Sequence, residues 1–184
     1  MQCPICATIT LQPELLSADT YQSYRCHQCE GHLLKATDYY AWLQQQPRIQ
    51  PEQAYAGEPI QLEDTQQAKI CPSCDRLMRR YAVGRGTDMH LDCCASCDSV
   101  WFDRGEWAAL KGRNLHDEVY KVFTPHWQNN VRREQAKQRA TERYQQRFGE
   151  DFTKLNEVHQ WLYAHPKKAE LLAFLNQADP FRAI

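Results

Sequence analysis

Alternating apolar positions mark two short extended runs in residues 77–93 of the chain. The positions that share one parity are Leu77, Tyr81 and Val83 in the first run and Met89, Leu91 and Cys93 in the second. The runs are separated by Gly84-Arg85-Gly86. Alternation on both sides of a turn that contains glycine predicts a β-hairpin.

A third strand and a short helix are expected directly after this hairpin. Val100-Trp101-Phe102 is a short apolar run that is typical of a strand. Asp103 and Glu106 have the spacing of a capping box, which predicts a helix through Trp107 and Leu110.

The first part of the chain repeats this order more loosely, and a polar segment separates the two copies. Extended runs are expected around Ile9 and Leu11 and at Leu33-Leu34, and a helix through Tyr39, Tyr40, Trp42 and Leu43. Residues 44–70 hold three prolines, eight glutamines and few large apolar residues. This composition predicts an extended linker.

Helical periodicity replaces the alternation after Leu110. Leu115, Val119, Val122 and Phe123 fit one short helix. Thr124-Pro125 has the form of an N-cap followed by a first-turn proline, and it predicts a long helix that ends before Gly149. Two more helices are expected, one marked by Phe152, Leu155, Val158 and Leu162, the other after His165-Pro166 and ending near Asp179-Pro180.

Eight of the nine cysteines recur at a fixed spacing. Each set reads C-P-x-C, 19 residues, C-x-x-C, and the sets are displaced by 68 positions. Two thiolates on one tight turn can hold one ion, and a hairpin of about 19 residues returns the second pair to the first. The spacing predicts two structural Zn²⁺ ions. The ligands are Cys3, Cys6, Cys26 and Cys29 in one site and Cys71, Cys74, Cys94 and Cys97 in the other.

Redox, disulfide and iron–sulfur roles are the alternatives for these cysteines. A redox C-x-x-C lies between a strand and a helix of an α/β domain, and neither copy supplies that context. Met1-Gln2-Cys3 leaves no room for the charged and apolar regions of a signal peptide, so an oxidising compartment is not expected.

The other residues near the cysteines are expected to play supporting roles. The aromatic residues are expected to cover the zinc sites, and they are Tyr39, Tyr40, Trp42, Trp101, Phe102 and Trp107. Cys93 aligns with Arg25 in the register of the repeat, so we expect a bystander, with a reactive thiol as the alternative. Four thiolates close each site, so His27, His32 and His90 are expected to be neighbouring or surface groups.

Residues 71–110 resemble the bacterial zinc-ribbon family that is named for its likeness to the zinc ribbon of transcription factor IIB. The matching residues are Cys71, Pro72, Cys74, Leu91, Asp92, Cys94, Cys97, Trp101, Phe102, Asp103, Gly105 and Glu106. The resemblance implies zinc binding and work linked to nucleic acid or transcription. It covers about a fifth of the chain, and residues 3–43 look like a diverged copy.

The chain departs from this family at the turns that carry the cysteines. The family usually has glycine after the second and fourth cysteines, where the turn requires positive φ. Here these positions are Ala7, Glu30, Asp75 and Asp98. The first copy also lacks the family's tryptophan-containing tail, so a partner contact made by that tail is not expected there.

Charge limits the kind of partner that the chain can bind. It carries 22 Lys/Arg and 23 Asp/Glu, and two filled zinc sites would lower its net charge from −1 to about −5. Residues 112–184 hold 12 Lys/Arg against 9 Asp/Glu, whereas residues 1–70 hold 4 against 8. Contact with nucleic acid would therefore be local. The absence of an apolar run of about 18 residues predicts a soluble protein without membrane partners. Together with the missing signal peptide and the family resemblance, it leads us to expect a cytoplasmic protein.

Four arginines of the long predicted helix form a basic stripe, within about 80° of one another on a helical wheel. They are Arg132, Arg139, Arg143 and Arg147. The stripe is interpreted in three ways: as a solvated face, as a set of phosphate contacts, or as a surface for an acidic protein. The apolar faces of residues 152–175 predict either a small helical core or a surface for homo-oligomerisation.

We therefore predict an α+β protein in which two small zinc-ribbon modules, each a β-hairpin plus a short helix, precede an all-α region. The predicted segments are a first ribbon at 1–43, a Pro/Gln-rich linker at 44–70, a second ribbon at 71–111 and a helical region at 112–184.

Function is expected to lie in binding rather than in catalysis. The sequence shows no open metal position, no separate group of histidines and carboxylates, and no glycine loop for phosphate, so an enzyme is not expected. The first hypothesis is a nucleic-acid or transcription-associated binding module. The alternatives are a protein-interaction adaptor or assembly factor, and a redox switch in which thiolate oxidation ejects zinc.

Overall fold

The chain forms two compact units. The computed structural model describes residues 1–16, 22–45 and 62–181, which divide into Met1–Arg133 and Glu134–Ile184. The first unit contains strands and helices, and it includes both cysteine repeats, the first repeat (residues 3–43) and the second repeat (residues 71–111). The α+β class predicted from the sequence is confirmed. Residues 46–61, most of the predicted linker, lie outside the described residues.

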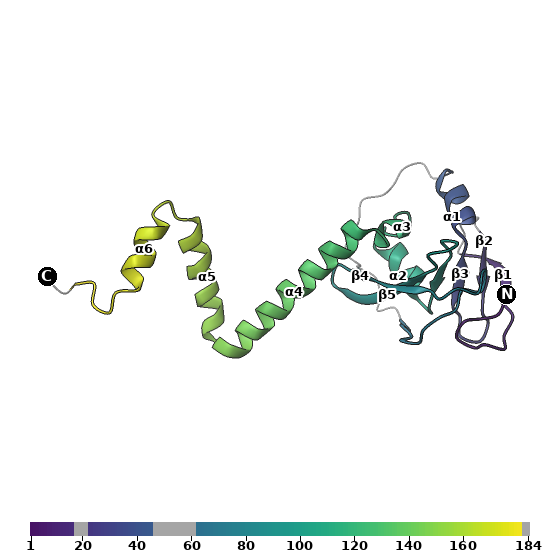
Figure 1. Ribbon diagram of the computed structural model, residues 1–184, viewed down its shortest axis with the longest axis horizontal. Coiled ribbons are helices and arrows are strands. Elements are labelled where there is room, and N and C mark those ends of the chain that lie inside the picture. The colour runs from purple at the N-terminus through teal and green to yellow at the C-terminus, as the bar shows by residue number, and fades with distance from the viewer. Residues whose placement is uncertain (17–21, 46–61, 182–184) are drawn as a thin grey trace. The chain divides into compact units, whose positions relative to one another are not determined.

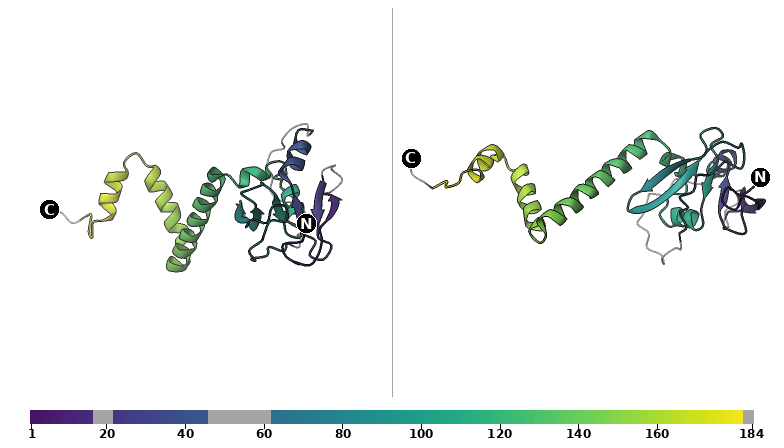
Figure 2. Two further views of the ribbon diagram at one scale, coloured as in Figure 1. Left: turned by 45° about the vertical axis from the view of Figure 1, so that its right-hand side comes forward. Right: turned by 60° about the horizontal axis from the view of Figure 1, so that its bottom comes forward.

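Six strands of the first unit form one antiparallel sheet in the order β1-β2-β3-β6-β5-β4 (Figure 1). The first repeat supplies β1 (Gln12–Leu15), β2 (Gln22–Arg25) and β3 (His32–Leu34), and the second supplies β4 (Arg79–Gly84), β5 (Thr87–Cys93) and β6 (Val100–Phe102). The β4–β5 hairpin (Figure 2) is the one predicted around Gly84-Arg85-Gly86. These three residues all have positive φ. Leu77 was expected in this hairpin, but it precedes β4 and is exposed.

The two repeats meet where β3 pairs with β6. The register is His32 with Phe102, Leu33 with Trp101, and Leu34 with Val100. Leu33 and Trp101 occupy the same position of the 68-residue repeat, so the pairing is symmetric about them. The sheet therefore resembles an isologous dimer interface that is contained in one chain.

Each face of the sheet has its own core, because successive strand residues point to opposite faces. Leu33 and Trp101 pack with the metal-site cysteines on one face. Leu34, Val100 and Phe102 pack on the other face with the helices. These helices are α1 (Ala36–Leu43), α2 (Glu106–Gly112), α3 (Val119–Val122) and the start of α4 (Pro125–Phe148).

Most aromatic residues lie on the helical face, so the expectation that they cover the metal sites is wrong for all but Trp101. Tyr39, Trp42 and Trp107 belong to the helical core. There the backbone N–H of Val119 donates to the hydroxyl of Tyr39 at 3.3 Å. Phe102 differs from Trp101 because successive residues of β6 point to opposite faces of the sheet. Tyr39, Trp42 and Trp107 lie in helices, and the spacing of the repeat does not determine which face of the sheet these helices cover.

The predicted helical region is packed on the second repeat over its first twenty residues. Leu115, Val119 and Val131 belong to the same core as the sheet. The indole of Trp127 donates to the carbonyl of Val83 at 2.9 Å. A Cβ on Gly84 would lie 2.6 Å from Cγ2 of Val131, so glycine here permits the close approach of α4. The predicted division of the chain at residues 43, 70 and 111 stays a prediction.

The second unit consists of helices in its described residues. It contains the end of α4, followed by α5 (Asp151–Ala164) and α6 (Lys168–Leu175), which contact each other. The α4 helix has the limits that Thr124-Pro125 and Gly149 predict. Within the described part of the chain, no helix combines the length and apolar character needed to cross a bilayer.

Substitution of Gly31 by alanine should destabilise the junction between the repeats. The added Cβ would lie 2.3 Å from Cζ2 of Trp101. This indole is fully buried and donates to Oδ1 of Asp103 at 2.7 Å, so it cannot move aside without losing that bond. Thermal or urea unfolding of the zinc-loaded protein should show a free energy of unfolding that is lower by about 1–3 kcal/mol. An unchanged free energy of unfolding would show that the ring is free to shift.

Candidate metal centres

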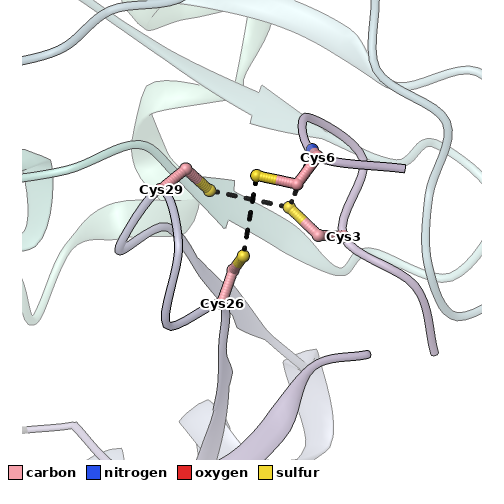
Figure 3. A group of neighbouring side chains, drawn as sticks. All are labelled: Cys3, Cys6, Cys26 and Cys29. Atoms are coloured by element: carbon pink, nitrogen blue, oxygen red, sulfur yellow. Dashed lines mark hydrogen bonds between the residues drawn. The ribbon is translucent and has the colours of Figure 1, made fainter. Parts of the chain in front are cut away.

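The eight repeated cysteines form two clusters that could each hold one metal ion. In each repeat the first pair lies in the turn before the hairpin, and the second pair lies in the turn between the second and third strands. Figure 3 shows the first cluster, with the sulfurs of all four side chains turned toward one another. The sequence prediction that these residues come together is confirmed.

The sulfur separations fit a tetrahedral site. In the first cluster Sγ of Cys3 lies 3.6 Å from that of Cys29, and Sγ of Cys6 lies 3.8 Å from that of Cys26. Three pairs of the second cluster are separated by 3.4, 3.5 and 3.6 Å. A tetrahedron with Zn–S bonds of about 2.3 Å requires about 3.8 Å between sulfurs. A disulfide requires about 2.05 Å, so the geometry favours a metal and is consistent with zinc.

All four cysteine turns contain a residue with left-handed φ at the position after the second cysteine. The values are 57° for Ala7, 57° for Glu30, 57° for Asp75 and 54° for Asp98. The N–H of each of these residues donates to the carbonyl of the first cysteine of its pair, at 2.8–3.0 Å. Each turn therefore has the conformation expected from the family resemblance, but without the glycine that adopts it most easily.

Each cluster has a buried half and a solvent-facing half. Cys3, Cys26, Cys71 and Cys94 are at most 1% exposed, whereas the second cysteine of each pair is partly exposed. Equivalent residues of the two repeats, among them Pro4 and Pro72, line one shallow depression. The two clusters therefore lie next to each other in the first unit, related by the pseudo-two-fold symmetry of the sheet.

Metal binding at these clusters is linked to proton release. Burial raises the pKa of Cys6 to about 11, although a hydrogen bond with the Cys29 thiol acts in the opposite direction. Since zinc binds the thiolate form, its binding must displace this proton, and affinity falls as the pH is lowered. Four thiolates satisfy a tetrahedral ion, so neither cluster leaves a position for a substrate.

Cys93 lies on the opposite face of the sheet from the metal clusters. It belongs to the helical core, whereas its neighbour Cys94 belongs to the core around the cysteines. Burial raises the pKa of the Cys93 thiol to about 12, which makes it a poor nucleophile at neutral pH. The structure thus supports the bystander role. Its parity with Met89 and Leu91 was the sequence signal for this placement.

The histidines near the clusters interact with other side chains. Nδ1 of His90 lies 3.0 Å from Oδ2 of Asp64, and Nδ1 of His32 lies 3.4 Å from Oγ of Ser23. Burial lowers the pKa of His32 to about 4, so this side chain is neutral at physiological pH. Among the described residues, the groups identified as possible metal ligands include no histidine.

A buried polar network fastens the end of the predicted linker to the second repeat, and the sequence did not predict it. Lys69 is fully buried, and its ammonium lies 2.6 Å from Asp92 and 3.3 Å from Asp103. Oδ2 of Asp103 also accepts hydrogen bonds from the N–H and the hydroxyl of Thr65. Residues 63–69 are therefore part of the fold of the second repeat rather than of a free linker.

Three carboxylates of this region, Asp64, Asp103 and Glu106, are also close enough to bind a cation. The ammonium of Lys69 already supplies positive charge beside Asp103. Asp64 bonds Arg80 and His90, and Glu106 accepts the N–H of Asp103 at 2.8 Å. The N-cap of α2 is Gly105, so the predicted capping box that begins at Asp103 is not formed. Burial raises the pKa of Glu106 well above its usual value, so the group favours its neutral form. We interpret this cluster as structural.

The four arginines of the predicted stripe lie on the exposed surface of α4. Arg132 belongs to the first unit and donates to Oδ1 of Asn129 at 2.6 Å. Arg139, Arg143 and Arg147 belong to the second unit. Within the described part of the chain, none of the four forms an ion pair.

Comparisons of the chain with protein-family models, with curated proteins and with solved structures gave no match.

Purified protein should contain two zinc ions, and neighbouring cysteine variants should differ in zinc content. Cys93→Ser should keep both ions, because Cys93 faces the helical core. Cys94→Ser should keep at most one and should unfold the second repeat, because metal binding supplies folding energy in so small a unit. Elemental analysis and circular dichroism of unoxidised protein measure this. Equal loss of zinc from both variants, or fewer than two ions in the wild type, would contradict the assignment.

Ala7→Gly should strengthen the first site. Alanine at φ 57° is strained, and glycine removes about 0.5–1 kcal/mol of that strain. The first site should then retain zinc against a chelator up to about fivefold more strongly. Ala136→Gly, an exposed position inside α4, is the matched control and should not change zinc affinity. Unchanged or weaker retention in Ala7→Gly would show that the turn is not under strain.

Proposed function

We propose that this protein is a zinc-stabilised binding module without enzymatic activity, and that α4 contacts the phosphates of nucleic acid. The two zinc ions would hold the cysteine turns, and the closed four-thiolate sites support a structural role over a catalytic one. The resemblance of the second repeat to the zinc-ribbon family supports the same proposal.

The observation that carries the proposal is the uncompensated positive charge of α4. This helix contains six Lys/Arg and two Asp/Glu, although the whole chain has a net charge of −1. One of the two acids, Glu142, accepts a hydrogen bond from Gln138 at 3.0 Å and does not pair with an arginine. A helix of 24 residues is about 36 Å long, which matches roughly one turn of a nucleic-acid duplex.

A protein partner is the second candidate. The observation that favours it is the number of large apolar side chains exposed by the second unit, including Trp161 at 56% and Phe174 at 46%. An adaptor or assembly factor would cover such side chains with a polypeptide. A redox switch has less support. Cys93, the cysteine outside the two metal sites, is buried and therefore poorly accessible to an oxidant.

Replacing the four stripe arginines with glutamine should weaken binding to every nucleic-acid sequence. Each lost phosphate contact removes about 0.7–0.9 from the slope of log K against log salt, so the slope should flatten by up to about 3–4. Fluorescence anisotropy with labelled single-stranded RNA and duplex DNA, at several salt concentrations, measures the slope. Zinc content and unfolding temperature should not change.

Two double variants of α4 test whether nucleic-acid binding depends on the arginine stripe or only on the total positive charge of the helix. Arg139→Gln with Arg143→Gln removes two charges from the stripe, and Arg133→Gln with Lys137→Gln removes two from another side of the helix. The first pair should flatten the slope and the second pair should not. Equal slopes for both pairs, or no binding by the wild type at low salt, would reject the nucleic-acid proposal and favour the adaptor.

A further inference from the structure

Helix α6 is apolar on nearly all sides, and none of the residues that the structure describes packs over most of it. Apart from Lys168 and Glu170, α6 consists of Ala, Leu and Phe residues. None of its residues is buried, and Phe174 and Leu175 are 46% and 59% exposed. A helix that is apolar all round is normally enclosed by other elements. The described part of the second unit does not enclose α6.

The neighbouring helix α5 also exposes apolar side chains, but on one side only. Leu155, Val158 and Trp161 recur at intervals of three and are 46%, 42% and 56% exposed. Leu162, which continues this side, is the only buried residue of α5. The contact between α5 and α6 therefore covers one end of the apolar side and leaves the rest in water.

The exposed apolar area is close to what a dimer interface requires. Five side chains of α5 and α6 that belong to this surface are each 42–59% exposed, namely Leu155, Val158, Trp161, Phe174 and Leu175. Since a whole aromatic side chain offers roughly 150–250 Å², these exposed parts amount to about 500 Å². A standard interface buries about 800 Å² on each partner, of which about 65% is apolar in homodimers.

The charges beside this surface favour a second copy of the same chain. Lys154 and Glu157 flank Leu155 and Val158 on α5. An isologous contact places each copy of a patch against itself, so antiparallel pairing of two α5 helices about residue 156 brings Lys154 of one chain near Glu157 of the second copy. A lipid surface would instead require a predominantly basic polar side, and the charged residues of α5 and α6 are of both signs.

We propose that α5 and α6 form a homodimerisation surface, in which the apolar sides of two copies pack into a helical bundle. This surface lies outside the metal centres and outside the arginine stripe. The proposal is therefore independent of nucleic-acid binding.

The test is the oligomeric state of the full-length, zinc-loaded protein. Sedimentation equilibrium at about 1–100 μM should show a dimer for the wild type. Leu155→Glu with Val158→Glu should shift it to a monomer, with a dissociation constant raised at least tenfold. The matched control places the same two charges on the polar side of α5, as Thr153→Glu with Gln160→Glu, and it should remain dimeric.

Helix content and zinc content separate loss of association from loss of folding. If circular dichroism shows that the Leu155/Val158 variant has lost helix content, the milder variant Trp161→Ala is used instead. Trp161→Ala should weaken the dimer and leave the zinc content unchanged. A wild type that is monomeric at 100 μM would overturn the proposal and leave the surface to a foreign polypeptide. A dimer that survives Leu155→Glu with Val158→Glu would also overturn the proposal. So would equal dissociation of the dimer by this variant and by the control variant, Thr153→Glu with Gln160→Glu.

Discussion

Pairing of β3 with β6 is the interaction on which the first unit depends. Each cysteine repeat has about 40 residues, too few to bury a sufficient core by itself. The antiparallel seam from His32 to Leu34 and from Val100 to Phe102 joins them into six strands. The seam also places Leu33 and Trp101 in one core with both sets of cysteines. The two metal centres are therefore supported by a common interior.

The shared sheet also explains why helices gather on one side. The cysteine turns occupy one face, and the opposite face is apolar in both repeats, with Leu34, Val100 and Phe102. Helices α1 and α2 cover part of it, and α3 and the start of α4 complete it. Helix α4 begins in this core, and its residues after Arg133 belong to the second unit.

Buried polar side chains connect Lys69, which precedes the second repeat, to Asp92 and Asp103 within that repeat. Lys69 would be costly to bury by itself, but Asp92 and Asp103 supply opposite charge at hydrogen-bond distance. In the first repeat the position of Asp103 is taken by Lys35, whose ammonium donates to the hydroxyl of Tyr24 at 3.1 Å. The repeats therefore share thiol positions and strand order but differ in the polar contacts around them.

The sequence by itself determined the local features of this protein. Cysteine spacing identified both clusters, glycines identified the β4–β5 turn, and Thr124-Pro125 with Gly149 gave the ends of α4. These features depend on residues close in the sequence, through turn conformation, missing N–H groups and side-chain period. The family resemblance also identified the four positions with left-handed φ, although none is glycine.

Only the tertiary structure decided how these parts are joined. Every strand edge offers the same backbone groups, so no residue pattern singles out β6 as the partner of β3. Three hydrogen bonds illustrate this, because they join residues that are 23 to 80 positions apart. They connect Lys69 with Asp92, Trp127 with Val83, and Val119 with Tyr39. Such contacts arise from complementary shape and charge between distant segments, which the periodicity of a single segment does not contain.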